Sequence, residues 1–240
     1  MRLIDSDLQS PAYTAAADEA ILIARNEGIV PNTLHFYRRD VPTISLGHFQ
    51  KVEECVDLAK AKEKEVRLIR RMSGGSTIYT DPGQIIYSLT VHRSDLPSSP
   101  AEAFRIVCRG ILEALSLLGL DGEFEPVNDV LIGGRKISGS AQLRRGNVIA
   151  QHGTILVDTD LTLMSDVLRS RKRTADGMTA LAKEMEYVPS MDVVKGALVK
   201  GFSRALDESI TPGSMTEREE TLVADLIRNK YGTSRHTFLR

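Results

Sequence analysis

Residues 128–158 read NDVLIGGRKISGSAQLRRGNVIAQHGTILVD, a stretch in which three apolar segments are separated by two short turns. Gly133 and Gly134 suit a tight two-residue turn, and Arg144-Arg145-Gly146 suits a three-residue loop with Gly146 in the left-handed conformation. The stretch therefore predicts two successive hairpins, and the sheet is expected to be largely antiparallel.

The middle strand of these hairpins carries several polar residues. Side chains alternate along a strand, so one face is expected to hold Lys136, Ser138, Ser140 and Gln142. A three-residue loop would place His152 opposite Ser138 on this face, whereas a four-residue loop would turn His152 away. A lysine among small hydroxyl groups can hold an anionic ligand. The alternatives are a solvent-facing sheet edge with an ordinary surface lysine, and a structural role for His152.

The rest of the chain alternates short β-rich segments with capped helical segments. Strands are expected at 2–5, 33–37, 43–47, 67–71, 77–79 and 85–91. Helices are expected at 11–26, 53–65 and 99–119, from residue 161, at 191–206 and at 216–232. Because the strands group before and between helices without strict alternation, the fold class is predicted to be α+β, a mixed sheet flanked by helices. No linker divides the sequence, so one domain over residues 1–240 is expected.

Composition excludes several classes of protein. The 240 residues are 42% apolar and 26% charged, which indicates a globular chain with a substantial core. Lys and Arg number 31 against 32 Asp and Glu, so no overall field attracts nucleic acid or an anionic membrane. No segment has the pattern of a signal peptide or of a membrane span. The two cysteines, Cys55 and Cys108, are typical of a reducing compartment, and a cytoplasmic protein is expected.

A glycine-rich break interrupts the chain at residues 70–79, which read RRMSGGSTIY. Consecutive glycines allow the backbone N–H groups to approach a ligand closely, and the preceding arginines supply positive charge, so phosphate is a natural ligand. No Lys-Ser/Thr pair follows and the next element is a strand, which excludes a Walker loop and a Rossmann motif. A plain hairpin turn with two solvated arginines is the alternative.

Asn128 and Asp129 precede the middle hairpin strand. They could simply cap a turn. They could also supply oxygen ligands to Mg²⁺, which usually binds one or two carboxylates together with phosphate oxygens and water.

Three motifs in order, RRMSGGSTIYTD (70–81), NDVLIGGRKISGSAQ (128–142) and QHGTILVDTDL (151–161), resemble the lipoate-protein ligase family of the biotin/lipoate ligase superfamily. The resemblance extends along almost the whole chain. It implies the fold of that superfamily, which is biotin synthetase-like and related to the catalytic domains of class II aminoacyl-tRNA synthetases. It also implies ATP-dependent activation of lipoate or octanoate to the acyl-AMP, followed by transfer to a lysine of a lipoyl-carrier protein.

The same resemblance assigns roles to individual residues. Lys136 matches the catalytic lysine, which touches both lipoate and the α-phosphate. The nucleotide-contacting positions are Arg71, Gly74, Gly75, Ser76, Thr77, Ile78, Tyr79 and Lys136. The lipoate-contacting positions are Gly75, Lys136 and His152. The magnesium ligands are Asn128 and Asp129. Ser76 stands where the family usually has a third glycine.

The resemblance also implies binding partners for the chain and alternative functions. The carrier would be a lipoyl domain or a protein like the H protein of glycine cleavage, and the chain resembles the split archaeal type that uses a separate small accessory subunit. A cysteine-dependent octanoyl or lipoyl transferase of the same fold, which needs no ATP, is the closest alternative. The segment before Lys136, EFEPVNDVLIGG, contains no cysteine, which argues against it. A non-catalytic lipoate-binding subunit is the third possibility.

Overall fold

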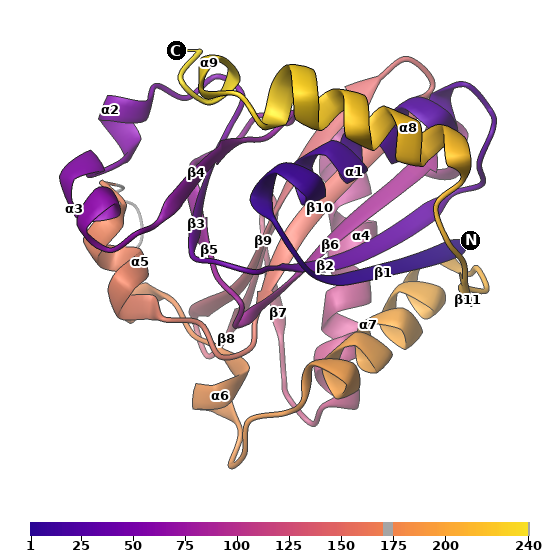
Figure 1. Ribbon diagram of the computed structural model, residues 1–240. Coiled ribbons are helices and arrows are strands. Elements are labelled where there is room, and N and C mark those ends of the chain that lie inside the picture. The colour runs from indigo at the N-terminus through magenta and orange to yellow at the C-terminus, as the bar shows by residue number, and fades with distance from the viewer. Residues whose placement is uncertain (170–174, 240) are drawn as a thin grey trace.

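A computed structural model describes residues 1–169 and 175–239 (Figure 1). Its large sheet has the strand order β11-β1-β2-β6-β10-β9-β8-β7. The pairs that β1 makes with β11 and β2 are parallel, and all other neighbouring strands pair antiparallel. The strands are β1 (Arg2–Gln9), β2 (Thr33–Arg39), β6 (Gln84–His92), β7 (Glu123–Glu125), β8 (Asp129–Ile132), β9 (Arg135–Arg145), β10 (Val148–Leu156) and β11 (Thr211–Pro212). The predicted mixed, largely antiparallel sheet is confirmed.

A smaller sheet has the order β4-β3-β5, in which β3 (Thr43–Leu46) pairs parallel with β4 (Arg67–Arg70) and antiparallel with β5 (Ile78–Thr80). Residues 71–77 of the glycine-rich break connect β4 to β5 and are called the glycine loop below. The two strands that flank the glycine loop are therefore the outer strands of this sheet.

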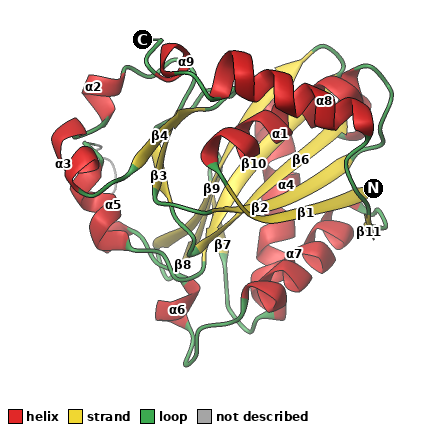
Figure 2. Cartoon of the chain, in the orientation of Figure 1, coloured by secondary structure: helices red, strands yellow, loops and turns green. Residues whose placement is uncertain are grey.

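Helices cover both faces of the large sheet (Figures 1 and 2). Helices α1 (Pro11–Asn26) and α8 (Glu217–Leu226) lie on one face, and α4 (Pro100–Leu117) and α7 (Met191–Leu206) lie on the other. Beside the small sheet lie α2 (Val52–Cys55), α3 (Leu58–Glu63) and α5 (Leu161–Val167). The remaining helical turns are η1 (Arg93–Asp95), η2 (Ala175–Gly177), α6 (Leu181–Glu184), η3 (Ile227–Tyr231) and α9 (Ser234–Thr237).

The predicted helix starts are confirmed. Ser10 and Ser99 each accept a backbone N–H in the first turn of α1 and α4, with a proline at the first helical position. Thr216 and Glu219 form a capping box at the start of α8. These caps satisfy backbone donors that a helix end otherwise leaves open.

One predicted helix is divided, and the last one changes its helical type. The segment 53–65 breaks at Val56, which is extended and bridges to Leu168, and Asp57 then caps α3. The last helix ends at Gly232 as predicted: α8 continues into the π-helical turn η3, Gly232 is its C-cap, and α9 follows as a separate turn. At Val56 tertiary pairing, which helix propensity does not contain, decides the break.

The second hairpin turn differs from the prediction. Arg145 pairs with Val148, so the turn is Gly146-Asn147 and the expected three-residue loop is wrong. The Oδ1 atom of Asn26, at the end of α1, accepts the N–H of Asn147, which favours the tighter turn. Because the register shifts, His152 lies opposite Ala141 and not opposite Ser138.

A β-bulge changes the face of Lys136. Val130 pairs with Ser138 but Leu131 pairs with Lys136, so Ile137 is an extra residue on β9. Lys136 therefore shares a face with Gly139: a Cβ added to Gly139 would lie 2.5 Å from the Cε and Nζ atoms of Lys136. Ser140 points the other way. The predicted common polar face is wrong because strict alternation holds only in an unbulged strand.

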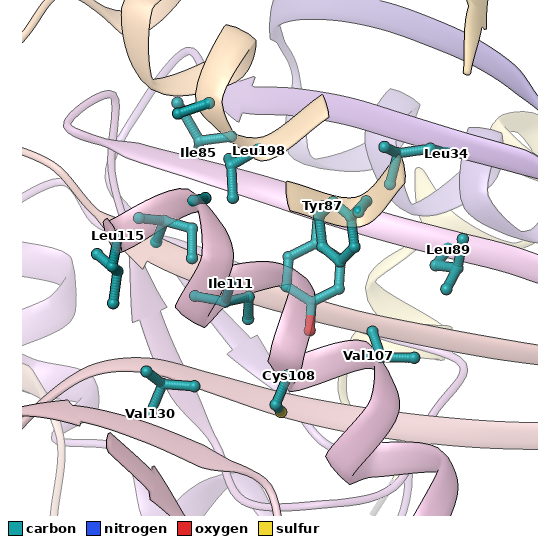
Figure 3. Close-up of a cluster of buried hydrophobic side chains, with 14 of the residues drawn as sticks. Leu34, Ile85, Tyr87, Leu89, Val107, Cys108, Ile111, Leu115, Val130 and Leu198 are labelled. Atoms are coloured by element: carbon teal, nitrogen blue, oxygen red, sulfur yellow. The ribbon is translucent and has the colours of Figure 1, made fainter. Parts of the chain in front are cut away.

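The main hydrophobic core lies between the large sheet and helices α4 and α7 (Figure 3). Tyr87 of β6 and Cys108 of α4 both point into it, and the Tyr87 hydroxyl lies 2.7 Å from the Oγ atom of Ser140. This face of β9 is thus sealed by packing, and a ligand must approach β9 from its other face. Among the described residues, we find no helix with the length and apolar character needed to cross a membrane.

Candidate active site

A cavity of about 630 Å³ lies between the two sheets. Residues of α1, β2, β5, β9, β10, α5 and the glycine loop line it. It brings together the predicted site residues Arg71, Gly75, Ser76, Thr77, Ile78, Tyr79, Asn128, Asp129, Lys136 and His152. Gly74 does not line the cavity: its carbonyl faces Arg71 instead. Residues from distant parts of the sequence thus form one concave site, which is the usual geometry of a small-molecule site.

Lys136 is one of the cations that line the cavity. Its Nζ atom lies 2.6 Å from the Oδ1 atom of Asp129, and 21% of the side chain is exposed. The side chain runs over Gly139, where any larger residue would collide with it. Asp129 therefore holds Lys136 in place as its counter-ion, and Gly139 leaves room for the lysine side chain. Lys136 faces the cavity and not bulk water.

Arg71 organises the glycine loop from within. Its guanidinium donates to the carbonyl oxygens of Ser45, Gly74 and Ser76 at 2.7–2.8 Å and to the Oγ atom of Ser73 at 3.1 Å. Burial lowers the pKa of Arg71 to about 10, so the group stays charged at neutral pH. Most of its N–H groups donate hydrogen bonds to the glycine loop itself. Arg71 also lines the cavity, so its positive charge lies beside the loop at the cavity wall.

His152 connects the large sheet to the glycine loop. Its Nε2 atom lies 2.6 Å from the Oγ atom of Ser73, and its Nδ1 atom lies 4.0 Å from the Oδ2 atom of Asp18. Burial lowers the pKa of His152 to about 4, an effect that the Asp18 charge opposes and Arg71 reinforces. His152 is thus a neutral imidazole at neutral pH, with both ring nitrogens directed at protein groups.

A buried acid that the sequence patterns do not predict lies next to His152. Asp18 of α1 accepts from the Tyr37 hydroxyl and lies 2.9 Å from the Nδ1 atom of His35. Burial alone would raise the pKa of Asp18, but the His35 hydrogen bond and charge outweigh it and the net pKa is lowered. The one indication in the sequence is a charged residue inside the apolar stretch that forms α1. If that residue is buried, its carboxylate needs several hydrogen-bonding partners nearby.

Asn128 and Asp129 lie beside Lys136. The Nδ2 atom of Asn128 donates to the Ser140 carbonyl, which leaves the amide oxygen as the acceptor this side chain can offer. Among the described residues no group of three or more His, Cys, Asp or Glu side chains could hold a metal. One carboxylate and one amide oxygen nevertheless fit Mg²⁺ when phosphate oxygens and water complete its shell.

Neither cysteine of the chain lines the cavity. Cys108 is buried beneath β9 with its Sγ atom 3.9 Å from the Oγ atom of Ser140, and burial raises its pKa to about 12. Cys55 of α2 is half-buried and its thiol donates to the Oε1 atom of Gln50 at 2.9 Å. A reactive thiolate at the acyl site would require a cysteine in the cavity.

Comparison with solved structures reveals close neighbours. A lipoate-protein ligase A solved with bound ATP has a TM-score of 0.90 at 30% identity, covering 99% of this chain and 98% of that one. A bi-partite lipoate protein ligase from Thermoplasma acidophilum has a TM-score of 0.89 at 29% identity, covering 100% and 97%. A biotin protein ligase from Aquifex aeolicus shares the fold, with a TM-score of 0.53 at 14% identity over 86% of this chain and 70% of that one.

Among curated proteins, the similar chains are named octanoyltransferases, whereas the structural neighbours above are named ligases. An octanoyltransferase LipM from Halalkalibacterium halodurans is 34% identical over 99% of this chain and 98% of its own. The LipM octanoyltransferase from Geobacillus kaustophilus is 33% identical over 100% and 98%. The family model of the lipoyl protein ligase A/B catalytic domain matches residues 10–203. This chain therefore belongs to the lipoyl protein ligase A/B catalytic-domain family, and the similar proteins are named lipoate-protein ligases and octanoyltransferases.

Proposed function

We propose that this chain, acting as one catalytic domain over residues 1–240, uses ATP to activate lipoate or octanoate and transfers the acyl group to a lysine of a lipoyl-carrier protein. The observation that carries the proposal is the content of the cavity: a lysine paired with a carboxylate beside a glycine loop, and no thiol. Such a site can stabilise phosphate and carboxylate charge, but it offers no cysteine to form a thioester.

In the first step, the acid's carboxylate oxygen attacks the α-phosphorus of ATP, and the bond to pyrophosphate breaks. Two anions meet, so the ammonium of Lys136 and the N–H groups of the glycine loop would offset the repulsion. The Lys136–Asp129 ion pair must open or be shared when the anions arrive. Loss of one preorganised donor of this kind typically raises a barrier by about 3–4 kcal/mol.

In the second step, the neutral amine of the carrier lysine attacks the acyl carbonyl carbon. The amide bond forms, the bond between the acyl carbon and the AMP phosphate oxygen breaks, AMP departs and the proton of the amine passes to solvent. Lys136 would again stabilise the negative charge that develops on the carbonyl oxygen. Because the cavity is lined by both sheets, it can hold the acyl chain away from water while the amine enters.

Asp129 and Asn128 would hold Mg²⁺ next to the phosphates. Bound there, Mg²⁺ would supply charge neutralisation and orientation of the phosphate oxygens. Asp129 also keeps Lys136 in place before substrates bind, through its Oδ1 atom, so its carboxylate has two roles.

A second candidate is an octanoyltransferase that takes its acyl group from a carrier thioester without ATP. The names of the LipM relatives favour it. The positions of the two thiols oppose it, because Cys108 faces the opposite side of β9 and Cys55 is hydrogen-bonded to Gln50 outside the cavity.

One experiment separates the two candidates. The purified chain is incubated with an apo lipoyl domain and either free octanoate with ATP and Mg²⁺ or an octanoyl-carrier thioester without ATP. Mass spectrometry follows acyl-AMP, acyl-enzyme and the modified lysine. The ligase proposal expects acyl-AMP and modified domain only in the first mixture, with the same result for Cys55→Ser and Cys108→Ala. Modified domain in the second mixture, lost in one cysteine variant, would replace the proposal by the transferase.

The same experiment also tests whether the chain requires an accessory subunit and which acid it prefers. Acyl-AMP that forms only when a separate small subunit is added would assign this chain to a two-part ligase. Parallel reactions with lipoate and octanoate report the preferred acid through the ratio of kcat/KM.

A further inference from the structure

Arg70, the last residue of β4, is completely buried directly before the glycine loop. Its Nη1 group donates to the carbonyl oxygens of Gly47, His48 and Gln50 at 3.0, 3.2 and 2.7 Å, and its Nε group donates to the carbonyl of Thr237 at 3.1 Å. The planar guanidinium thus ties residues 47–50 to the C-terminal segment, a geometry that a lysine cannot reproduce.

Residues 47–50 in turn pack against the glycine loop. The N–H of His48 donates to the Ser73 carbonyl at 2.8 Å. Gly47 lies so close to Gly75 that a Cβ atom on Gly47 would be 2.0 Å from the Gly75 carbonyl oxygen. The position of residues 47–50 therefore sets the position of the main chain at Ser73 and Gly75.

The C-terminal helical turn α9 contacts both the side chain and the main chain of Arg70. Besides the Thr237 contact, the Nε2 atom of His236 lies 3.2 Å from the Arg70 carbonyl oxygen. Helix α9 lies beside β4 near the C-terminus (Figure 1). These contacts join residues that are 166 and 167 positions apart in the sequence.

We propose that Arg70 and α9 form a clamp that positions the glycine loop for the nucleotide. Neither Arg70 nor residues 234–239 line the cavity, so they act through residues 47–50 and not by touching a substrate. The proposal rests on the proposed function in one respect, that the glycine loop binds ATP. Arg70 is accordingly a positioning residue whose loss moves the loop while Lys136 stays in place.

The first test compares two shortened chains. A chain that ends at Thr233 lacks α9, whereas a control that ends at Phe238 keeps both the His236 ring and the Thr237 carbonyl. Calorimetry measures the Kd for ATP, and hydrogen–deuterium exchange measures protection of residues 72–77. In the chain ending at Thr233 we expect about tenfold weaker ATP binding, a raised KM for ATP with a smaller change in kcat, and faster exchange. The control should match the full chain.

A second pair of variants covers the case in which the shortened chain does not fold. Arg70→Lys keeps the charge but loses the planar fork, and Arg67→Lys makes the same change at an exposed position of β4. Weaker ATP binding and faster loop exchange in Arg70→Lys alone support the clamp. Unchanged exchange of residues 72–77 in Arg70→Lys overturns it.

The two hypotheses fail in different ways. If the full chain binds no ATP, the proposed function fails, while the exchange of residues 72–77 still decides the clamp. If the full chain binds ATP and both clamp variants bind it equally well with an equally protected loop, the clamp is wrong and the proposed function stands.

Discussion

The Nε2 atom of His152 on β10 lies 2.6 Å from the Oγ atom of Ser73 in the glycine loop. This hydrogen bond joins the large sheet to the loop of the small sheet beside the cavity. Ser73 also accepts from Arg71, and His152 is backed by the buried carboxylate of Asp18. The loop is therefore positioned from inside by this chain of polar contacts and from outside by residues 47–50.

Acidification is expected to destabilise the protein through His152. Its folded-state pKa is lowered from 6.5 to about 4 by burial. As the pH falls from about 6.5 to about 4, the unfolded chain takes up a proton at this residue and the folded chain does not, so stability falls by at most about 1.4 kcal/mol per pH unit. Urea denaturation at several pH values should show a smaller pH dependence for His152→Gln. Equal slopes for the two proteins would contradict the assignment.

Replacing the cavity lysine should abolish activation without unfolding the protein. For Lys136→Ala we expect at least about a 100-fold loss in the rate of acyl-AMP formation, because one preorganised charge is removed. The melting temperature should change little, since the side chain is partly exposed. Lys200→Ala, at an exposed position of α7, is the matched control. Near-normal turnover of Lys136→Ala would exclude the proposed mechanism.

Gly139→Ala should act on Lys136 indirectly. The added Cβ would lie 2.5 Å from the Cε and Nζ atoms of Lys136, so the lysine must leave its position. A loss of activity of about 10- to 100-fold is expected, since small displacements of catalytic groups are costly. Gly196→Ala has no atom within 4 Å of its new Cβ and serves as the control. A fully active Gly139→Ala enzyme would show that the observed position of Lys136 is not the catalytic one.

Asp129→Asn should raise the Mg²⁺ requirement. The substitution removes the one carboxylate that we assign to the metal, so half-maximal acyl-AMP formation should need about tenfold more Mg²⁺. It also releases Lys136 from its counter-ion. Asp121→Asn, at an exposed position, controls for the loss of one charge. Unchanged Mg²⁺ dependence in titrations of the reaction rate would place the metal elsewhere.

Much of the fold follows from local sequence. The helix caps at Ser10, Ser99 and Thr216 lie where their residue types predict, and the Gly133-Gly134 turn has positive φ at both residues. The order of the three motifs was enough to indicate the family. These features depend on contacts between residues a few positions apart, which the sequence displays directly.

The sequence by itself therefore determined the antiparallel hairpins, the glycine loop and the presence of a lysine near it. Only the tertiary structure decided which way Lys136 points, because the bulge at Ile137 arises from pairing with β8. It likewise decided the partners of His152 and Arg70, which lie 20 to 167 residues away along the chain. Side-chain alternation and turn chemistry are local properties, whereas strand register and buried polar contacts are set by segments that meet only when the chain folds.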